Sequence, residues 1–562
     1  MIATRQVDIL GAALLGLVFL LPVGDGPWFS FWHEWTAGVA VLLIVLGAVS
    51  RMRFERRTVR VDFLSLPSLA IVLAAVPWLQ WLAGIEFYHG DAALVSAYLV
   101  AFGLCVAVIQ SMALDERVAL GDRLAWAMLF AAICSVPLAV LQWVGLLRLE
   151  LGIGIVAGRP VAHMEQTNLL CSLLIQGLLG AWRLRERGRL GSWPFAIMAF
   201  LLLLTMTLTQ SRVSWLVVTA ASAAFVWRRE SLRLHGRELL FLVAALVIGF
   251  GALAVPWADF QLGLTGLTLE DRLTGGRRPD VWRLFLDAVA FRPWLGWGPL
   301  QNGAAQFAVA LRHPALMWSF SSAHDFILDL MIWFGAPIGL VAGGTLIAAV
   351  FLGVKRAADA ASFTTSLAIL ALVLHGLVEL PLHYLYFLLP LGLMLGVLGP
   401  VRSSSARSWR LPTQGSASFA MLAVVPAMFL ALLARDYMPL SDNRPVLAYD
   451  RVAVHESLSG TPDIPDAFIL DQLMQFHVFA AQVPVTGLSR STIDGLRQPM
   501  LRFPFVPSQE HYARILGLNG RSQEALDVLQ RSCTFMRPLQ CDENRRAWTY
   551  WQSNGEPLPD WP

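Results

Sequence analysis

The chain has 562 residues, of which 56% are hydrophobic and only 14% are charged, and its mean hydropathy is +0.60. A soluble protein of this length needs far more charge to cover its surface, so these values exclude a soluble globular protein. They predict an all-α polytopic integral membrane protein, because backbone polar groups in lipid must be satisfied within each element, which open sheets cannot do.

Thirteen apolar runs follow one another along the chain, and a helix needs roughly 20 residues to cross a bilayer. They lie near residues 8–22, 37–50, 66–83, 92–110, 122–146, 167–182, 193–209, 213–227, 239–256, 324–352, 362–380, 384–400 and 417–435. We therefore predict about 12–13 transmembrane helices. The first run lacks a small-residue cleavage site and precedes further spans, so it does not resemble a cleavable signal peptide.

Basic residues alternate with the runs, which predicts the orientation of the chain. Lys and Arg follow the second, fourth, sixth, eighth, tenth and twelfth runs, whereas the loops 23–36, 84–91 and 381–383 carry none. Because basic loops remain in the cytoplasm, the N-terminus is expected inside and the tail 436–562 outside. In a Gram-negative bacterium the outer side is the periplasm, so this orientation would describe a multi-pass protein of the bacterial inner (cytoplasmic) membrane whose functional surface faces the periplasm.

This orientation divides the chain into four segments. Residues 1–256 form an N-terminal transmembrane bundle, 257–323 a large periplasmic loop, 324–435 the C-terminal transmembrane helices and 436–562 a periplasmic helical tail. Within the tail, residues 511–529 read as two short helices joined by Asn519-Gly520, like one tetratricopeptide repeat unit. Such a unit could dock a partner or simply cap the fold. Cys533 and Cys541 could form a disulfide if the tail is extracytoplasmic.

His324 stands at the mouth of an apolar helix, after the longest polar segment of the membrane half. A neutral imidazole accepts a proton near pH 7, so a histidine at a membrane–water boundary could activate a hydroxyl. A solvated or helix-capping histidine is the structural alternative.

Arginines on the outer side depart from the positive-inside trend. Arg212 lies between two spans, and Arg277 and Arg278 are adjacent in the large loop. A guanidinium group can bind phosphate oxygens in a bidentate fashion and stays charged at any working pH. The alternative for Arg212 is an arginine that snorkels to lipid headgroups.

No metal-ligand spacing, P-loop or serine nucleophile elbow is present in the sequence, and no metal or other cofactor is expected. A base together with fixed cations suits displacement of a diphosphate leaving group by a hydroxyl.

At this point the motifs resemble a family. Ala323-His324-Asp325-x-x-Leu328-Asp329-Leu330-Met331-x-x-x-Gly335 resembles the Ala-His-Asn-x-x-Leu-Gln motif of the O-antigen ligase/polymerase (Wzy/WaaL-like) superfamily, especially its bacterial protein O-oligosaccharyltransferases (PglL-type). Further matching stretches are Pro77-Trp-Leu-Gln80 with Tyr88-x-Gly90-Asp91, Arg159-Pro with Gln166-Thr-Asn168, Ser211-Arg212, Arg278-x-x-x-Trp282, Pro293-x-x-Gly296-x-Gly298 and His375-Gly-Leu-Val-Glu379-Leu-Pro381.

The resemblance implies roles for individual residues. His324 would be catalytic, Arg212, Arg278 and Arg277 would bind the diphosphate, and Asp325, Gln166, Asn168 and Glu379 would support the site. Asp325 replaces the family's Asn, and such a neighbouring carboxylate would favour protonated His324. Asp329 replaces Gln, Trp333 a common Glu and Thr167 a Pro.

The expected activity is en bloc transfer of an oligosaccharide from undecaprenyl diphosphate to a Ser or Thr of a periplasmic or pilin protein, without a metal. An O-antigen ligase acting on lipid A–core, or a polymerase, is the alternative within the superfamily. A transporter of lipid-linked glycans is the alternative of another class, but it would place charges in mid-span, whereas here they cluster at the outer ends. No nucleic-acid partner is expected.

Overall fold

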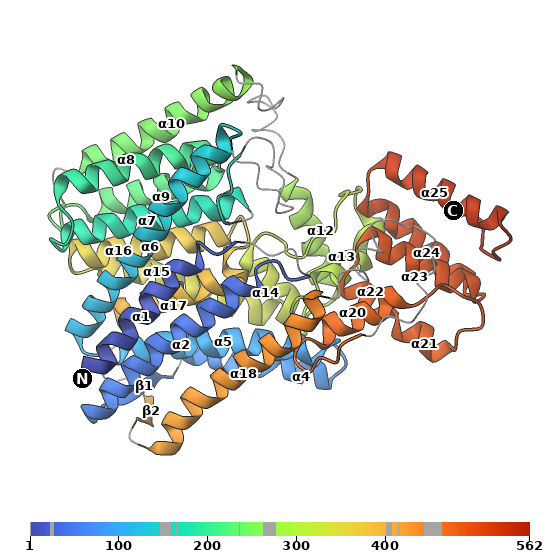
Figure 1. Cartoon of the computed structure of the whole chain (residues 1–562), viewed down its shortest axis with the longest axis horizontal. Coiled ribbons are helices and arrows are strands. Elements are labelled where there is room, and N and C mark those ends of the chain that lie inside the picture. Colours follow the sequence, from blue (N-terminus) through green and yellow to red (C-terminus); the bar gives the residue numbers. More distant parts are fainter. Residues whose placement is uncertain are drawn as a thin grey trace. The chain divides into compact units, whose positions relative to one another are not determined.

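The computed structural model describes residues 2–22, 27–63, 65–146, 159–164, 166–234, 237–261, 277–400, 407–413, 415–442 and 464–561. Parts of the predicted large loop (262–276) and of the tail (443–463) lie outside them, as do residues 147–158 and 165. The described chain is mostly helical with one short two-stranded sheet, which confirms the predicted all-α class (Figure 1). Contacts between helices divide it into two compact units.

The first unit comprises residues 1–72, 98–275 and 344–430. Its elements are α1 (Ile2–Val18), α2 (Phe31–Phe54), β1 (Thr58–Asp62), α3 (Leu66–Leu73), the second part of α5 (His89–Gln110), α6 (Leu114–Trp143), α7 (Thr167–Glu186), α8 (Ser192–Thr209), α9 (Arg212–Arg228), α10 (Glu238–Gln261), most of α15 (Ala336–Arg356), α16 (Ala360–Gly376), η2 (Pro381–His383), α17 (Leu385–Leu398), β2 (Ser408–Pro412) and the start of α18 (Ser416–Asp442). α7 is its central helix and packs against α6, α8, α9 and α16.

Each predicted apolar run coincides with a helix or with a pair of consecutive helices. In the described residues, six helices are long and apolar enough to cross a membrane, and four apolar helices are shorter. The run 66–83 contains two helices, α3 and α4 (Val76–Leu82), and the run 324–352 contains α14 (Phe326–Phe334) and α15. The chain is thus a multi-pass membrane protein.

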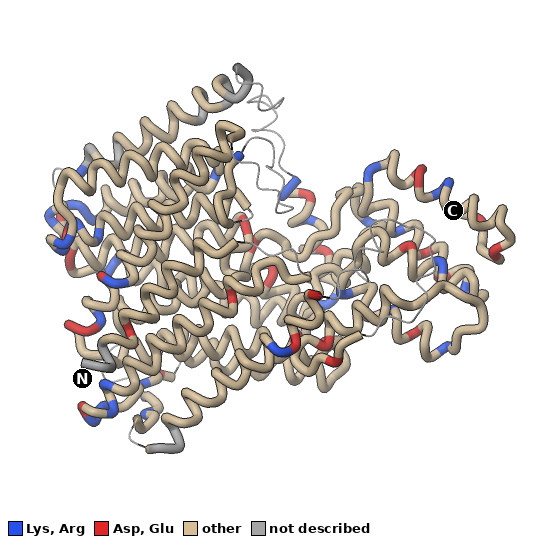
Figure 2. The backbone as a smooth tube through the Cα atoms, in the orientation of Figure 1, with Lys and Arg blue, Asp and Glu red and all other residues tan. Residues whose placement is uncertain are grey.

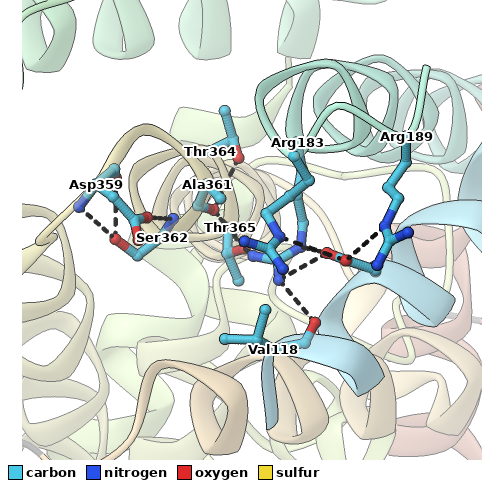
Figure 3. A network of polar contacts seen from close by, with 10 residues as sticks. Val118, Arg183, Arg189, Asp359, Ala361, Ser362, Thr364 and Thr365 are labelled. Carbon is cyan, nitrogen blue, oxygen red and sulfur yellow. Dashed lines mark hydrogen bonds and ion pairs between the residues drawn. The ribbon is translucent and has the colours of Figure 1, made fainter. Parts of the chain in front are cut away.

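The basic loops gather at the end of the first unit where α1 begins (Figure 2). There β1 and β2 pair antiparallel, with Arg60 opposite Arg410. Figure 3 shows a buried network nearby, in which Arg183 donates to the carbonyl of Val118 and to Thr365 Oγ1, at 3.0 and 2.9 Å. Arg183 also pairs with Asp122 at 3.0 Å. These bonds link the ends of α6, α7 and α16 that the charge pattern assigned to one side of the membrane.

The second unit comprises residues 73–97, 276–343 and 431–562. Its helices are α4, the start of α5, α12 (Arg278–Phe291), α13 (Asn302–Val309), η1 (Ala310–Arg312), α14, the start of α15, the end of α18, α20 (Asp471–Ala481), α21 (Arg490–Gly495), α22 (Arg497–Arg502), α23 (Val506–Leu518), α24 (Ser522–Ser532), η3 (Cys533–Phe535) and α25 (Pro538–Ser553). The predicted helix pair is confirmed: α23 and α24 pack together, and Gly520 between them takes φ +75°.

The tail and part of the predicted large loop share one hydrophobic core. Phe307 of α13 and Ala310 of η1 are buried in the same cluster as Met500, Tyr512 and Trp548 of the tail. α13 approaches the tail so closely that a β-carbon at Gly303 would come within 2.6 Å of Pro504. Cys533 and Cys541 form a disulfide at the start of η3 and in α25, which answers the question left open by the sequence.

A buried ion pair and a partly exposed histidine contact join the tail to the segment that begins α5. Arg502 donates to both carboxylate oxygens of Asp91, at 2.5 and 3.1 Å, and Asp91 is completely buried. His89 Nδ1 lies 2.8 Å from Asp471 on α20. A buried charge is tolerated only when it is paired and hydrogen-bonded, so these partners depend on one another.

Candidate functional site

The loop before α14 carries His324 in an unusual backbone conformation. Its φ is +57°, in the left-handed region that residues with a β-carbon rarely adopt. The backbone N–H of His324 donates to Ser322 Oγ at 2.9 Å, and the ring of Phe320 meets the imidazole edge-on with centroids 6.0 Å apart. The side chain is partly exposed. The loop therefore presents a histidine at the N-terminal end of a helix, where solutes can reach it.

Asp325 begins the helix. Its Oδ1 accepts hydrogen bonds from the backbone N–H groups of Ile327 and Leu328, at 2.8 and 3.1 Å, which makes it the N-cap of α14. The sequence suggested that the Asp325 carboxylate would favour protonated His324. In the structure, Asp325 Oδ1 instead contacts the first amides of α14. Capping of the helix is therefore a sufficient reason for an acidic residue at this position.

Asp329 lies one turn further along α14 and is almost fully buried. Its carboxylate accepts hydrogen bonds from Asn302 Nδ2 at 2.6 Å, Ser322 Oγ at 2.7 Å and the N–H of Ala323 at 2.8 Å. Sequence reasoning noted residue 329 only as a departure from the family motif. The sequence feature that could have identified Asp329 is a carboxylate inside an apolar helix. Such a carboxylate must have hydrogen-bond donors nearby, because an unpaired buried charge is costly.

α12 brings an arginine toward the same loop. Trp282 Nε1 donates to the carbonyl of Ala323, the residue before His324, at 3.1 Å. Arg278 is the first residue of α12 and lies four positions before Trp282, so both occupy one face of the helix. The spacing Arg278-x-x-x-Trp282 thus places both residues on the face of α12 that contacts the loop before α14. We call this loop, which carries His324, the histidine loop.

Arg277 has a different environment. Its NH1 donates to the carbonyl of Leu316 at 2.6 Å, and its NH2 lies 3.4 Å from the sulfur of Met317. These contacts hold the segment between η1 and His324 against the start of α12. The guanidinium group is otherwise exposed.

A second polar cluster lies in the first unit, where the ends of α7, α8, α9 and α16 meet. Asn168 Nδ2 donates to Glu379 Oε1 at 2.7 Å, and Asn168 Oδ1 accepts from Ser211 Oγ at 2.8 Å. Arg159 Nε donates to the carbonyl of Thr209 at 2.8 Å. We call Arg159, Asn168, Ser211 and Glu379 the asparagine cluster. It unites three of the stretches that resembled the family, although they are far apart in the sequence.

Two predicted residues border the asparagine cluster. Arg212 directly follows Ser211, opens α9 and is exposed, while Ser211 caps that helix by accepting from the N–H of Val213. Gln166 occupies the N-cap position of α7, two residues before Asn168. Arg159 belongs to the cluster and was not among the predicted site residues, although the stretch that contains it was noted.

The eight predicted residues therefore form two groups of four. His324, Asp325, Arg277 and Arg278 belong to the second unit, and Arg212, Gln166, Asn168 and Glu379 belong to the first. Within each group, the hydrogen bonds join segments that are distant in sequence.

Comparisons with known proteins agree with these motifs. The family described as "O-Antigen ligase" matches residues 197–343, and the family described as "Virulence factor membrane-bound polymerase, C-terminal" matches residues 364–536. A "General O-oligosaccharyltransferase" of Acinetobacter baylyi (strain ATCC 33305 / BD413 / ADP1) is 28% identical over 535 residues, which cover 92% of this chain and 90% of the relative. A "ComP-specific O-oligosaccharyltransferase" of the same strain is 24% identical over 396 residues, covering 69% of this chain and 70% of the relative.

Proposed function

We propose that this chain moves an oligosaccharide en bloc from undecaprenyl diphosphate to a Ser or Thr hydroxyl of a periplasmic or pilin protein. It is a glycosyltransferase of the O-antigen ligase/polymerase superfamily and, within that superfamily, belongs to the PglL-type O-oligosaccharyltransferases. The observation that carries this proposal is His324, presented in a left-handed turn at the start of α14 within the family's histidine motif.

In the proposed reaction, His324 accepts the proton of the acceptor hydroxyl. The hydroxyl oxygen then bonds to the anomeric carbon of the first sugar, while the bond between that carbon and the diphosphate oxygen breaks. The electron pair leaves with the lipid diphosphate, whose developing charge Arg278 stabilises. Its position on the α12 face that contacts the histidine loop supports this role.

Arg212 is proposed as a second diphosphate ligand. It is an exposed arginine at the start of a helix and borders the asparagine cluster, where Asn168 and Glu379 orient the turn that carries it and Gln166 adds support. Arg277 is proposed as a weaker contributor, because part of its guanidinium group already binds the Leu316 carbonyl. No step requires a metal ion.

We further propose that this chemistry takes place on the periplasmic side of the inner membrane. The disulfide Cys533–Cys541 supports an oxidising environment for the tail, because disulfides persist outside the cytoplasm. The basic residues gathered at one end of the first unit, with the β1–β2 pairing and the Arg183–Asp122 ion pair, support a cytoplasmic location for that end.

The test uses purified full-length protein, a glycan linked to undecaprenyl diphosphate and a pilin-type protein with Ser and Thr residues. We expect a glycan-sized mass increase on the acceptor in the presence of EDTA and without nucleotide. The His324→Ala variant should lose transfer by about 100-fold or more, because general base catalysis contributes on this scale. Full transfer by folded His324→Ala protein would refute the mechanism.

The match to the family described as "O-Antigen ligase" favours one second candidate, in which lipid A–core is the acceptor. Offering both acceptors in the same reaction separates the two functions. Labelled lipid A–core with an unmodified pilin would support the ligase instead.

A further inference from the structure

Asp329 is a charged residue whose surroundings are unusually complete. It lies in the apolar helix α14 and is 1% exposed, so an ionised carboxylate there needs several donors. Two of its donors, Ser322 Oγ and the N–H of Ala323, come from the loop before the helix, and the third, Asn302 Nδ2, comes from α13. The carboxylate thus ties a loop to two helices.

The hydrogen bonds continue from Asp329 to His324. Ser322 Oγ donates to Asp329 Oδ2 and accepts from the backbone N–H of His324. The peptide group between Ser322 and Ala323 is held through its N–H, and the carbonyl of Ala323 is held by Trp282 Nε1. Backbone groups directly before the imidazole are therefore fixed from α12 and α14.

This network opposes the intrinsic cost of the His324 conformation. A non-glycine residue in the left-handed region is strained and persists only where its surroundings determine it. Asn302 is itself held, because its Oδ1 accepts from Trp333 Nε1 at 2.7 Å and its side chain is fully buried. The series of hydrogen bonds from Trp333 through Asn302 and Asp329 to Ser322 provides surroundings that determine the His324 conformation.

We propose that Asp329 is a positioning residue for His324: through Ser322 and Ala323 it holds the loop in the conformation that presents the imidazole to the acceptor hydroxyl. This inference rests on the proposed function, since it assigns a purpose to the geometry of the base. A purely structural network would instead affect stability while leaving the turnover of each folded molecule unchanged.

The first experiment measures transfer kinetics of Asp329→Asn and Ser322→Ala in the assay described above, normalised to folded protein. A displacement of about 1 Å at a catalytic group can cost on the order of 100-fold in rate. We expect Asp329→Asn to reduce kcat by roughly 10- to 100-fold, with little change in the donor KM, and Ser322→Ala to act in the same direction. Ser322→Ala breaks a single link, so it keeps the test decisive if Asp329→Asn fails to fold.

Asp287→Asn is the matched control. Asp287 is a partly exposed carboxylate of α12 in the same unit, where it pairs with Arg312 at 3.5 Å and with His313 at 3.3 Å. Removing its charge should leave kcat and KM unchanged.

A second readout does not depend on transfer. Diethyl pyrocarbonate modifies histidine, and mass spectrometry reports its rate at each site. In Asp329→Asn protein the rate at His324 should change at least severalfold, while His313 serves as the internal reference. Unchanged kcat together with unchanged His324 reactivity in a folded variant would overturn the proposal. Failure of the proposed function looks different: the unaltered protein would give no product, whereas the coupling between residues 329 and 324 would still be measurable.

Discussion

At the scale of single residues, the backbone conformation of His324 depends on residues a few positions away in the sequence and on others that are distant in the sequence. Its φ of +57° is supported by Ser322 and, through it, by Asp329. Trp282 of α12 donates to the same loop, and Asn302 of α13 donates to Asp329. A histidine alone is a weak signal of catalysis; a strained histidine surrounded by satisfied buried donors is a stronger one.

Arg278→Ala should weaken use of the lipid donor. Loss of a charge-assisted hydrogen bond costs about 1.5–3 kcal/mol, which corresponds to a fall in kcat/KM for the donor of roughly 10- to 100-fold. Arg278→Lys should recover part of the loss, because lysine keeps the charge but not the bidentate geometry. Initial rates against donor concentration measure both.

Arg283→Ala on the same helix is the control for Arg278. Its side chain is 74% exposed and pairs with Asp280 at 3.1 Å, so kcat/KM for the donor should not change. Equal kcat/KM values for Arg278→Ala and Arg283→Ala would remove Arg278 from the site.

At the scale of elements, polar side chains at helix ends determine how the helices begin. Asp325 caps α14, Ser211 caps α9, and Asp359 forms a capping box with Ser362 at the start of α16. Each cap satisfies N–H groups that have no partner within the helix. In α14 and α9 the cap stands next to a proposed site residue, so helix initiation and site geometry depend on the same turns.

α20 in the tail should lose stability in acid. His477 is fully buried, and both of its ring nitrogens lack hydrogen-bond partners among the described residues. Burial lowers the pKa of His477 from 6.5 to about 4. Because the folded pKa is the lower one, its contribution to stability is complete above pH 6.5 and is lost as the pH falls toward 4.

Hydrogen exchange of the full-length protein at pH 7.5 and pH 5, corrected for intrinsic rates, should therefore show weaker protection of residues 471–481 at the lower pH. In His477→Phe protein this difference should shrink, though not vanish, because burial also lowers the pKa of His511 on α23 to about 4. An identical acid-induced loss in both proteins would show that His477 is not responsible.

At the scale of the whole molecule, each unit is assembled from segments distant in the chain. Asp91 and Arg502 are 411 positions apart and form a buried bidentate pair in the second unit. Asn168 and Glu379 are 211 positions apart and form the centre of the asparagine cluster in the first. The tail is therefore an integral part of the second unit and shares its core with α13.

Arg502→Ala should destabilise the protein severely. It leaves the fully buried Asp91 without a counter-charge, and breaking a buried pair on one side costs about 3–5 kcal/mol. Burial already raises the pKa of nearby Glu86 well above its usual range, so this environment disfavours further negative charge. Thermal unfolding of the detergent-solubilised full-length protein measures the effect.

The double variant Asp91→Asn with Arg502→Met should recover part of that stability, since it removes both charges. Arg490→Ala is the control, because that side chain is 91% exposed and lies 3.9 Å from Asp494. If Arg502→Ala were as stable as Arg490→Ala, the buried pair would not contribute to holding the tail.

The sequence by itself determined the membrane class and the positions of the apolar helices, and it predicted which loops share a side, because hydropathy and charge act locally along the chain. It also identified His324, Arg278 and the stretches around Asn168 and Glu379 as places where chemistry was expected. Only the tertiary structure revealed that Asp329 supports the His324 loop, that Arg159 joins the asparagine cluster and that the tail shares a core with α13. Buried polar groups must find partners, and those partners came from segments whose proximity exists only after folding.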